Sequence, residues 1–187
     1  MAARRLGRSC LTAVLLLGLT ACVTNANAPQ PSLVANVLTA TRKNCGATYT
    51  LDGYDRGQAN VYAVGIYPEA GVILRGFPDQ AALAGFIHAH ATLLSAPGNA
   101  LGTFCESKRG DCHKGESTAV TCYLDVSRLT PNLAEAARLA RGCNQKSIAF
   151  LGTHGIEIID KQAGQPFGDG LPVAGSRLAT CRTARGE

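Results

Sequence analysis

The sequence predicts an α+β domain in which antiparallel hairpins alternate with two helices and disulfides stabilise a single domain. Three observations predict it. Short segments rich in β-branched and aromatic residues come in pairs separated by turn residues, as in hairpins. Two longer segments repeat apolar residues at helical spacing, and six cysteines lie beyond position 22. Hairpins that alternate with helices favour an antiparallel sheet on which the helices pack.

The first 22 residues have the pattern of a secretory signal peptide. Three arginines precede an apolar run from Leu11 to Leu19, and a positive segment followed by a short apolar run is typical of such signals. The run ends on Leu19-Thr20-Ala21-Cys22, which resembles the lipobox of bacterial lipoproteins. In that family a signal peptidase cuts before the cysteine, here Cys22, whose sulfur then carries a diacylglycerol.

The resemblance implies a signal peptide over residues 1–21 and a lipid anchor at Cys22. It places the domain in the bacterial cell envelope. Val23 stands where enteric lipoproteins retained at the inner membrane have Asp, which favours the outer membrane, facing the periplasm. The alternative is an ordinary cut after Ala28, in the sequence Ala-Asn-Ala, which gives a soluble periplasmic or secreted protein.

The charge of the processed chain excludes some partners. Residues 1–21 hold three of the 18 basic residues and none of the 13 acidic ones, so cleavage lowers the formal charge from +5 to about +2. Nucleic-acid binding relies on a strongly basic surface and on stacking aromatic side chains, and this chain has no Trp. We expect no nucleic-acid partner, a membrane contact through the lipid, and an envelope protein as partner.

Residues 22–44 are expected to form a flexible, lipid-anchored tether. They are rich in small and polar residues, and Pro29 and Pro31 discourage a helix. The single α+β domain then spans residues 45–187, and its first strand is predicted over Ala47–Leu51.

The first hairpin is predicted from Val61–Ile66 and Val72–Gly76, because the connection contains a proline and a glycine that favour a turn. A helix follows from Asp79 to Leu94, and the Asp79 side chain can cap its N-terminus. The residues that recur at helical spacing and form its expected core face are Leu83, Ile87, Ala91 and Leu94.

A second hairpin is predicted from Leu101–Ser107 and Thr118–Val126. In the second helix, Thr130 is the expected N-cap, Pro131 the first helical residue and Gly142 the end. The small residues on one face of this helix predict a close approach to its neighbour.

The last hairpin is predicted from Ser147–Leu151 and Gly155–Ile159. The chain from about residue 162 to Gly175 is dense in Gly and Pro and is expected to be irregular. Cys181 is expected to attach the C-terminal region to the domain.

Three short segments resemble, in their order along the chain, segments of small phage- or plasmid-associated proteins of unknown function. They are Gly98–Thr103, Leu124–Ser127 and Asn144–Ala149. This resemblance implies no activity.

An even number of cysteines in an exported domain predicts disulfides. Six cysteines allow 15 connectivities. Cys105, Cys112 and Cys122 are clustered in the sequence, so if two of them pair with each other, the third must bond to a distant cysteine. A zinc site is the competing interpretation, which the lack of a C-x-x-C pair disfavours, and no metal or other cofactor is predicted. The disulfide candidates are Cys45, Cys105, Cys112, Cys122, Cys143 and Cys181.

No catalytic residue is assigned. The chain lacks a nucleophile elbow, a P-loop and an H-E-x-x-H motif, and oxidised cysteines leave no thiol nucleophile. His90 and His154 are the candidate ligand-binding residues, His154 in a short turn. His88 is expected to point away from His90 into solvent, because residues two apart on a helix are separated by about 200°. His113 directly follows Cys112.

A charged connection in the second hairpin is the candidate partner-binding loop. A disulfide at Cys112 would pin it, and a pinned loop loses less entropy on binding. The alternatives are a solvated hairpin tip and an Arg-Gly-Asp adhesion motif. The charged residues concerned are Lys108, Arg109, Asp111 and Lys114.

These observations favour a non-catalytic envelope lipoprotein that acts as a protein-interaction module at the outer membrane or in the periplasm. One alternative is an exported hydrolase or cell-wall enzyme that uses His154 or His113 beside carboxylates. The other is a lipoprotein that binds a small ligand or a metal through His90 and a neighbouring acid.

Overall fold

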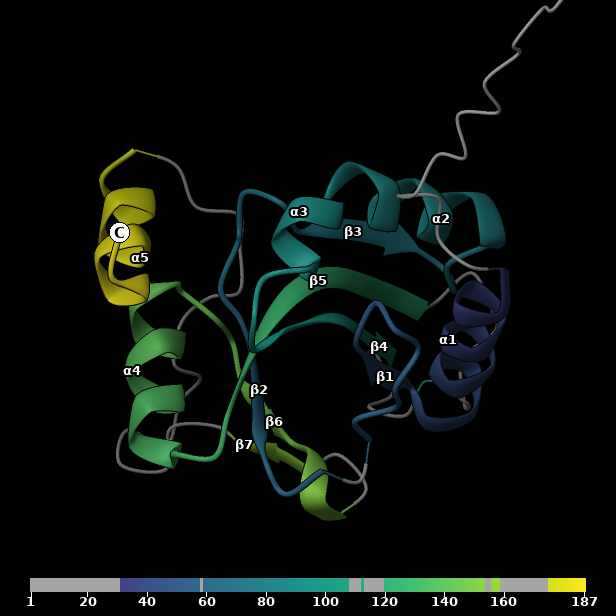
Figure 1. Ribbon diagram of the computed structural model, residues 1–187, viewed down its shortest axis with the longest axis horizontal. Coiled ribbons are helices and arrows are strands. Elements are labelled where there is room, and N and C mark those ends of the chain that lie inside the picture. Colours follow the sequence, from purple (N-terminus) through teal and green to yellow (C-terminus); the bar gives the residue numbers. More distant parts are fainter. Residues whose placement is uncertain (1–30, 58, 108–111, 113–119, 154–155, 159–174) are drawn as a thin grey trace, which may run out of the picture.

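The computed structural model describes residues 31–57, 59–107, 112, 120–153, 156–158 and 175–187. In this part of the chain, five α-helices surround one antiparallel, curled sheet, and three disulfides link the elements, so the domain is α+β as predicted. The helices lie outside the curl of the sheet (Figure 1). Within the described ranges, no helix has the length and apolar character needed to cross a membrane.

The sheet is built on one long hairpin. β4 (Asn99–Ser107) pairs antiparallel with β5 (Val120–Thr130) over nine residue pairs. This is the predicted second hairpin, and the structure confirms it. Because the side chains of a strand alternate between its two faces, Leu101, Leu124 and Val126 face the helices, whereas their neighbours in sequence face the inside of the curl.

The predicted first hairpin does not form. β2 (Tyr62–Gly65) and β3 (Val72–Arg75) both pair with β5, β2 with the C-terminal half of β5 and β3 with its N-terminal half. Residues 66–71 between them lie opposite only Asp125 and Val126 of β5. The turn residues were recognised correctly, but an 11-residue β5 is long enough to pair with both strands, and an isolated two-stranded hairpin is only marginally stable.

The remaining strands extend the sheet at both edges. β1 (Gly46–Tyr49) pairs with β4. β6 (Ile148–Phe150) pairs with β2 and with β7 (Ile156–Ile158), which gives the strand order β1-β4-β5-β2-β6-β7. The predicted first strand and last hairpin are thus confirmed, and the short 3₁₀ helix η2 (Leu151–Thr153) lies between β6 and β7.

The expected tether is wrong over residues 31–44, which form helix α1 (Pro31–Asn44). Pro31 takes the first helical position, where its missing N–H costs nothing. The polar composition of the segment obscured an apolar stripe at helical spacing. The buried residues of this stripe are Leu33, Val34 and Val37. Residues 22–30 lie outside the described part of the chain.

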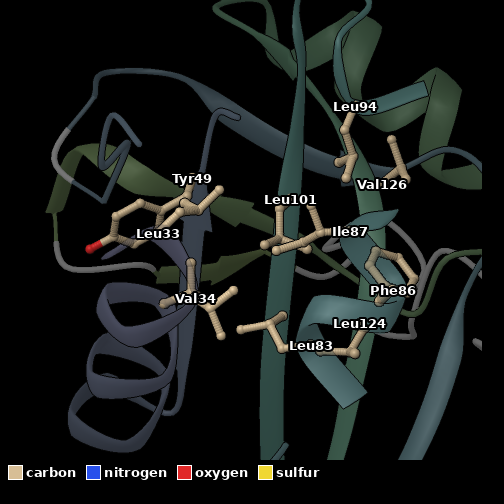
Figure 2. Packing of buried hydrophobic residues seen from close by; sticks show 11 residues of the cluster. Leu33, Val34, Tyr49, Leu83, Phe86, Ile87, Leu94, Leu101, Leu124 and Val126 are labelled. Carbon is tan, nitrogen blue, oxygen red and sulfur yellow. The ribbon is translucent and has the colours of Figure 1, made fainter. Parts of the chain in front are cut away.

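The predicted helix over residues 79–94 forms as two helices, α2 (Gln80–Ala89) and α3 (Ala91–Leu94), which meet at His90. Asp79 is the N-cap, as predicted, because its Oδ1 accepts a hydrogen bond of 2.7 Å from the Ala82 N–H. These helices and α1 cover the first core cluster (Figure 2), which includes Leu83, Phe86, Ile87, Leu94, Leu101, Leu124 and Val126.

The cap of the next helix, α4 (Leu133–Gly142), is Asn132 rather than Thr130. The Asn132 Oδ1 accepts a hydrogen bond of 3.1 Å from the Glu135 N–H. Thr130 instead ends β5, and its hydroxyl donates to the Glu135 carboxylate at 2.7 Å. Pro131 therefore precedes the cap and is not the first helical residue.

The segment expected to be irregular lies, up to residue 174, outside the described residues, and helix α5 (Ser176–Arg185), which follows it, packs against α4 (Figure 1). The two helices approach closely at Gly142, where an added Cβ would lie 2.5 Å from the Ala184 Cβ. Gly142 does not lie on the small-residue face predicted from the sequence: Ala136 and Ala140 of that face are fully buried in the core cluster with Val64 and Ile66. Helices α4 and α5 cover a second core cluster that includes Val64, Ile66 and Ile148.

The six cysteines form three disulfides, as predicted. Cys105 and Cys122 are paired residues of β4 and β5. The third clustered cysteine, Cys112, bonds to Cys45, 67 residues away. Cys143 bonds to Cys181 and attaches α5 to the end of α4.

We predict that thiol alkylation of the unfolded but unreduced Cys22→Ser protein, without its signal peptide, adds no label, because all six cysteines are oxidised. The same protein, reduced before alkylation, is the control and should gain six labels. Peptide mapping without reductant should recover the three pairs above. Labelled cysteines in the unreduced sample, or other pairs, would contradict the structure.

Candidate functional site on the concave face of the sheet

The inner face of the curled sheet lines a pocket of about 880 Å³. It is hollow because many of the strand positions that point inward carry small side chains, while the opposite face of the same strands carries larger apolar residues such as Val64, Leu101 and Leu124. The small inward residues include Gly46, Thr48, Ala63, Gly65, Gly102 and Ser127. We therefore take this concave face as the candidate functional site.

The register of β4 and β5 arranges the inward side chains in successive rows. Phe104 lies opposite Tyr123, Gly102 opposite Asp125, and Ala100 opposite Ser127. Rows two residues apart are separated by about 7 Å along a strand. The pocket thus changes from aromatic at the Tyr123 row to polar at the Asp125 and Ser127 rows.

Asp125 supplies the central polar group. Its Oδ1 accepts a hydrogen bond of 2.5 Å from the Ser127 hydroxyl. Protein surrounds most of the carboxyl group, and this burial raises its pKa above the ordinary Asp value, while the Ser127 hydrogen bond opposes the shift only in part. Asp125 is therefore an acid whose charge has no nearby base to balance it in the described structure.

Glycines on both neighbouring strands give the Asp125 side chain its room. A Cβ added at Gly102 of β4 would lie 2.4 Å from the Asp125 Oδ1 and 2.7 Å from the Ser127 Oγ. At Gly65 of β2, an added Cβ would lie 3.4 Å from the Asp125 Cγ and 2.8 Å from the Gln145 Oε1. Any larger residue at either position would displace these polar groups.

Gln145 brings a second acceptor to the same place. Its Nε2 donates a hydrogen bond of 3.2 Å to the Cys143 carbonyl oxygen. Because that partner can only accept, the amide is fixed with its Oε1 toward the space above Gly65. A carboxyl oxygen and an amide oxygen therefore approach the same region of the pocket.

The opposite end of the pocket is apolar and exposed. Phe104 stacks on Tyr123, with ring centroids 6.3 Å apart, and remains 39% exposed. Ile73 of β3 lies beside Tyr123 in the register and is 48% exposed. We call Ile73, Phe104 and Tyr123 the apolar mouth of the pocket.

An ion pair borders the apolar mouth. Lys146 lies 2.9 Å from the Glu106 carboxylate, and the Tyr123 hydroxyl donates to the same carboxylate at 2.8 Å. Burial alone would raise the pKa of Glu106, but the hydrogen bonds from Lys146 and Tyr123 outweigh it and lower that pKa. Burial and the bond to Glu106 together raise the pKa of Tyr123 to about 12. Lys146 is thus engaged with Glu106.

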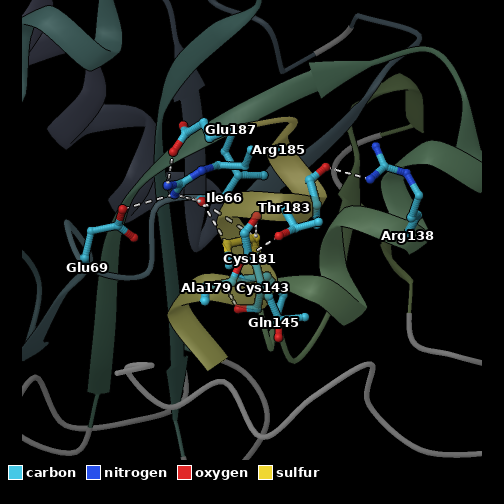
Figure 3. The surroundings of a disulfide bond; sticks show 12 residues. Ile66, Glu69, Arg138, Cys143, Gln145, Ala179, Cys181, Thr183, Arg185 and Glu187 are labelled. Atoms are coloured by element: carbon cyan, nitrogen blue, oxygen red, sulfur yellow. Dashed lines mark hydrogen bonds and ion pairs between the residues drawn. A yellow bond between two sulfur atoms is a disulfide. The ribbon is translucent and has the colours of Figure 1, made fainter. Parts of the chain in front are cut away.

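Arg185 of α5 contacts the segment of residues 66–71, which connects β2 to β3 and lies opposite Asp125 (Figure 3). Its Nη1 donates to the Ile66 carbonyl oxygen at 2.7 Å and lies 3.1 Å from the Glu69 carboxylate. Its guanidinium lies 4.4 Å from the ring centroid of Tyr67, which lines the pocket. The Cys181 sulfur also approaches the Ile66 carbonyl oxygen, at 3.2 Å. The C-terminal helix therefore fixes one wall of the site.

Of the side chains proposed from the sequence as binding residues, His90 is the one that lies in the described part of the chain, and it is not among the residues that line this pocket. The ring of His90 packs on Phe86, with centroids 4.7 Å apart, on the helix-covered side of the sheet, and His88 is exposed there. The remaining candidates lie outside the described residues: Cys22, Lys108, Arg109, Asp111, His113, Lys114 and His154.

Two acids of the pocket, Glu106 and Asp125, are too far apart to act together as the carboxylate pair of a glycosidase. Glu106 pairs with Thr121, and Asp125 pairs with Gly102, so the two acids are four residues apart along the hairpin, or about 13 Å. Glycosidases hold their carboxyl groups about 5–10 Å apart. The described side chains also include no group of three His, Cys, Asp or Glu placed to hold a metal ion.

Sequence reasoning missed Asp125, Ser127 and Gln145. A signal was present, because Gly102 and Gly65 interrupt otherwise apolar strands, and a glycine inside a strand often marks a close approach by another group. The cross-strand register that brings both glycines to Asp125 could not be obtained from one sequence. No family model, no curated protein and no solved structure matches this chain significantly.

We predict that Gly102→Ala lowers the free energy of unfolding by about 1–3 kcal/mol, because the new methyl group must displace Asp125 and Ser127. Gly85→Ala is the matched control. Gly85 lies on α2 with no atom near its Cβ position, so alanine there should raise the free energy of unfolding by about 0.5–1 kcal/mol. Urea unfolding measures both. Equal effects of the two substitutions would contradict the packing described around Asp125.

Proposed function

We propose that this chain is a lipid-anchored envelope lipoprotein whose folded domain acts without catalysis, as a protein-interaction module. Its contact surface is the concave face of the sheet, with the apolar mouth at its entrance. The lipobox-like ending at Cys22 supports the anchor, and the three disulfides suit an oxidising compartment outside the cytoplasm.

The observation that carries the proposal is the combination of a pocket with exposed apolar side chains at its entrance. Ile73 and Phe104 keep 48% and 39% of their surface exposed on a face that is also hollowed. Exposed apolar groups gathered beside a concave surface are typical of binding sites. A partner that covers Ile73 and Phe104 would remove their apolar surface from water, which is favourable.

The chain length constrains where such a partner lies. Helix α1 begins at Pro31, and the nine residue steps from Cys22 to Pro31 span at most about 30 Å when fully extended. A domain anchored through Cys22 therefore stays close to the membrane. The partner is accordingly a protein of the outer membrane or of the adjacent periplasm.

We predict that Phe104→Ser abolishes capture of the partner from native envelopes, because it removes the exposed ring at the apolar mouth. The measurement is mild cross-linking and pull-down through a C-terminal tag, followed by mass spectrometry. Leu133→Ser is the matched control, since Leu133 is a similarly exposed apolar residue, at 45%, on α4. It should retain the partner.

Circular dichroism and thermal unfolding of both variants establish that they remain folded. The Cys22→Ser form, which would remain soluble, controls for proteins captured through the membrane alone. A partner that both variants capture equally would exclude the concave face as the contact surface. Failure of the unmodified protein to capture any protein above the controls would contradict the interaction role itself.

A further inference from the structure

The chemistry of the pocket specifies the group that it accepts. The carboxyl group of Asp125 and the Oε1 of Gln145 both approach the space above Gly65, where an added Cβ would lie 3.4 Å from the Asp125 Cγ and 2.8 Å from the Gln145 Oε1. In the described part of the chain, Ser127 is the hydrogen-bond donor to Asp125, and it donates to the Oδ1. Adjacent acceptors without a donor between them are complementary to a ligand that brings several N–H groups.

The charges in the pocket favour a cationic donor. Lys146 is paired with Glu106, and Asp55 accepts hydrogen bonds from the Tyr49 hydroxyl and the Gly57 N–H. Among the described side chains, Asp125 has the neutral Ser127 hydroxyl as its hydrogen-bond partner and no basic group beside it. A buried carboxylate is strongly destabilised without an opposite charge, so a ligand cation would supply what this site lacks.

The rows of side chains favour a cation at the end of an apolar stem. The apolar mouth lies one row, or about 7 Å, from the Asp125 row. A lysine side chain has this form, because its four-carbon stem packs on apolar surface while the ammonium group reaches a polar partner. The aromatic rings of Phe104 and Tyr123 also offer π faces that attract a cation.

The unequal surroundings of the two Asp125 carboxyl oxygens favour lysine over arginine. A guanidinium binds a carboxylate best through two parallel hydrogen bonds, one to each oxygen. The Oδ1 of Asp125 lies against Gly102 and already accepts the Ser127 hydroxyl, so a guanidinium N–H would compete with Ser127 at this oxygen. An ammonium is a compact charge with three donors that can be shared between a carboxyl oxygen and an amide oxygen, which fits the Asp125 and Gln145 arrangement.

The geometry points to a lysine side chain of the protein partner as the occupant of the concave pocket, with its stem against Phe104 and Tyr123 and its ammonium group on Asp125 and Gln145. This inference rests on the proposed interaction role and names the chemistry of that contact. It predicts that the partner presents an accessible lysine beside an apolar surface.

The test is a titration of the isotope-labelled mature chain, carrying Cys22→Ser, followed by NMR. The probe is Nα-acetyl-lysine N-methylamide, and Nα-acetyl-norleucine N-methylamide is the neutral control with the same stem. We expect the lysine probe to shift the amide signals of Gly65, Gly102 and Asp125. The norleucine probe should bind at least about tenfold more weakly, as expected for loss of a charged hydrogen bond.

Asp125→Asn should weaken binding of the lysine probe at least about tenfold, because it removes the negative charge. Asp79→Asn is the matched control: it removes the same charge on the helix side of the sheet, where Asn also serves as an N-cap. It should leave binding unchanged. The corresponding arginine probe should bind more weakly than the lysine probe.

Binding should also depend on pH in a defined direction. The raised pKa of Asp125 means that its carboxyl ionises above the ordinary Asp value of about 3.9. Affinity for the lysine probe should therefore rise with pH as Asp125 loses its proton, and this rise should vanish in Asp125→Asn. The other titratable side chains that line the pocket are Lys43, Asp55, Tyr67, Glu106, Tyr123 and Lys146.

Three results would overturn the inference: no shift with the lysine probe, equal binding of the lysine and norleucine probes, or unchanged binding in Asp125→Asn. The comparison of the two probes uses the unsubstituted pocket and does not depend on how a variant folds. These outcomes are separate from the proposed function. Phe104-dependent capture without lysine binding refutes only the ligand, and lysine binding without such capture refutes only the interaction role.

Discussion

The nine-pair register between β4 and β5 is the constraint on which the rest of the structure depends. It places Leu101, Leu124 and Val126 under the helices and turns Gly102 and Asp125 into the curl of the sheet. A slip of one residue would exchange these faces. Carboxyl groups would then enter the core, and large apolar side chains would fill the pocket. The Cys105–Cys122 disulfide joins two paired residues and so fixes this register covalently.

The other two disulfides hold elements that lie at the edges of this frame. Cys45–Cys112 ties the start of β1 to the connection between β4 and β5, and Cys143–Cys181 ties α5 to α4. Each closes a long loop, of 67 and 38 residues in separation, and such links stabilise by about 2–4 kcal/mol, mainly by restricting the unfolded chain. The second also positions Arg185, which anchors the pocket wall at Ile66. Formation of these disulfides therefore helps to shape the proposed binding face.

The sequence was most informative where local chemistry decides the structure. The Asp79 cap, the β4–β5 hairpin and the three disulfides follow from residue types and spacing, and the structure has them. The predictions were wrong where the strands that pair are far apart in the sequence. The turn residues between β2 and β3 were recognised, but only the length of β5 decides that both strands pair with it.

The site was harder to predict than the fold for the same reason. Asp125 acquires its character from Gly65 and Gly102, which are far from it in sequence and adjacent only through the sheet. Helix α1 was predicted as a tether because of its polar composition and Pro31. The helical spacing of Leu33, Val34 and Val37 indicated a helix, and Pro31 stands at its first position, where a proline is accepted. His90 was predicted to bind a ligand because of its chemistry, but its ring packs on Phe86 on the helix-covered side of the sheet, where His88 is exposed.

The central claim is that the concave face, rather than the helix-covered exterior, meets the partner. It is tested most directly by placing a photo-cross-linking amino acid at position 73, at the apolar mouth, and separately at position 133 on α4, in the full chain expressed in bacteria whose envelopes are then analysed. The account predicts a discrete cross-linked protein from position 73 and none from position 133. A cross-link from position 133 alone would contradict it, and so would the absence of a product from position 73.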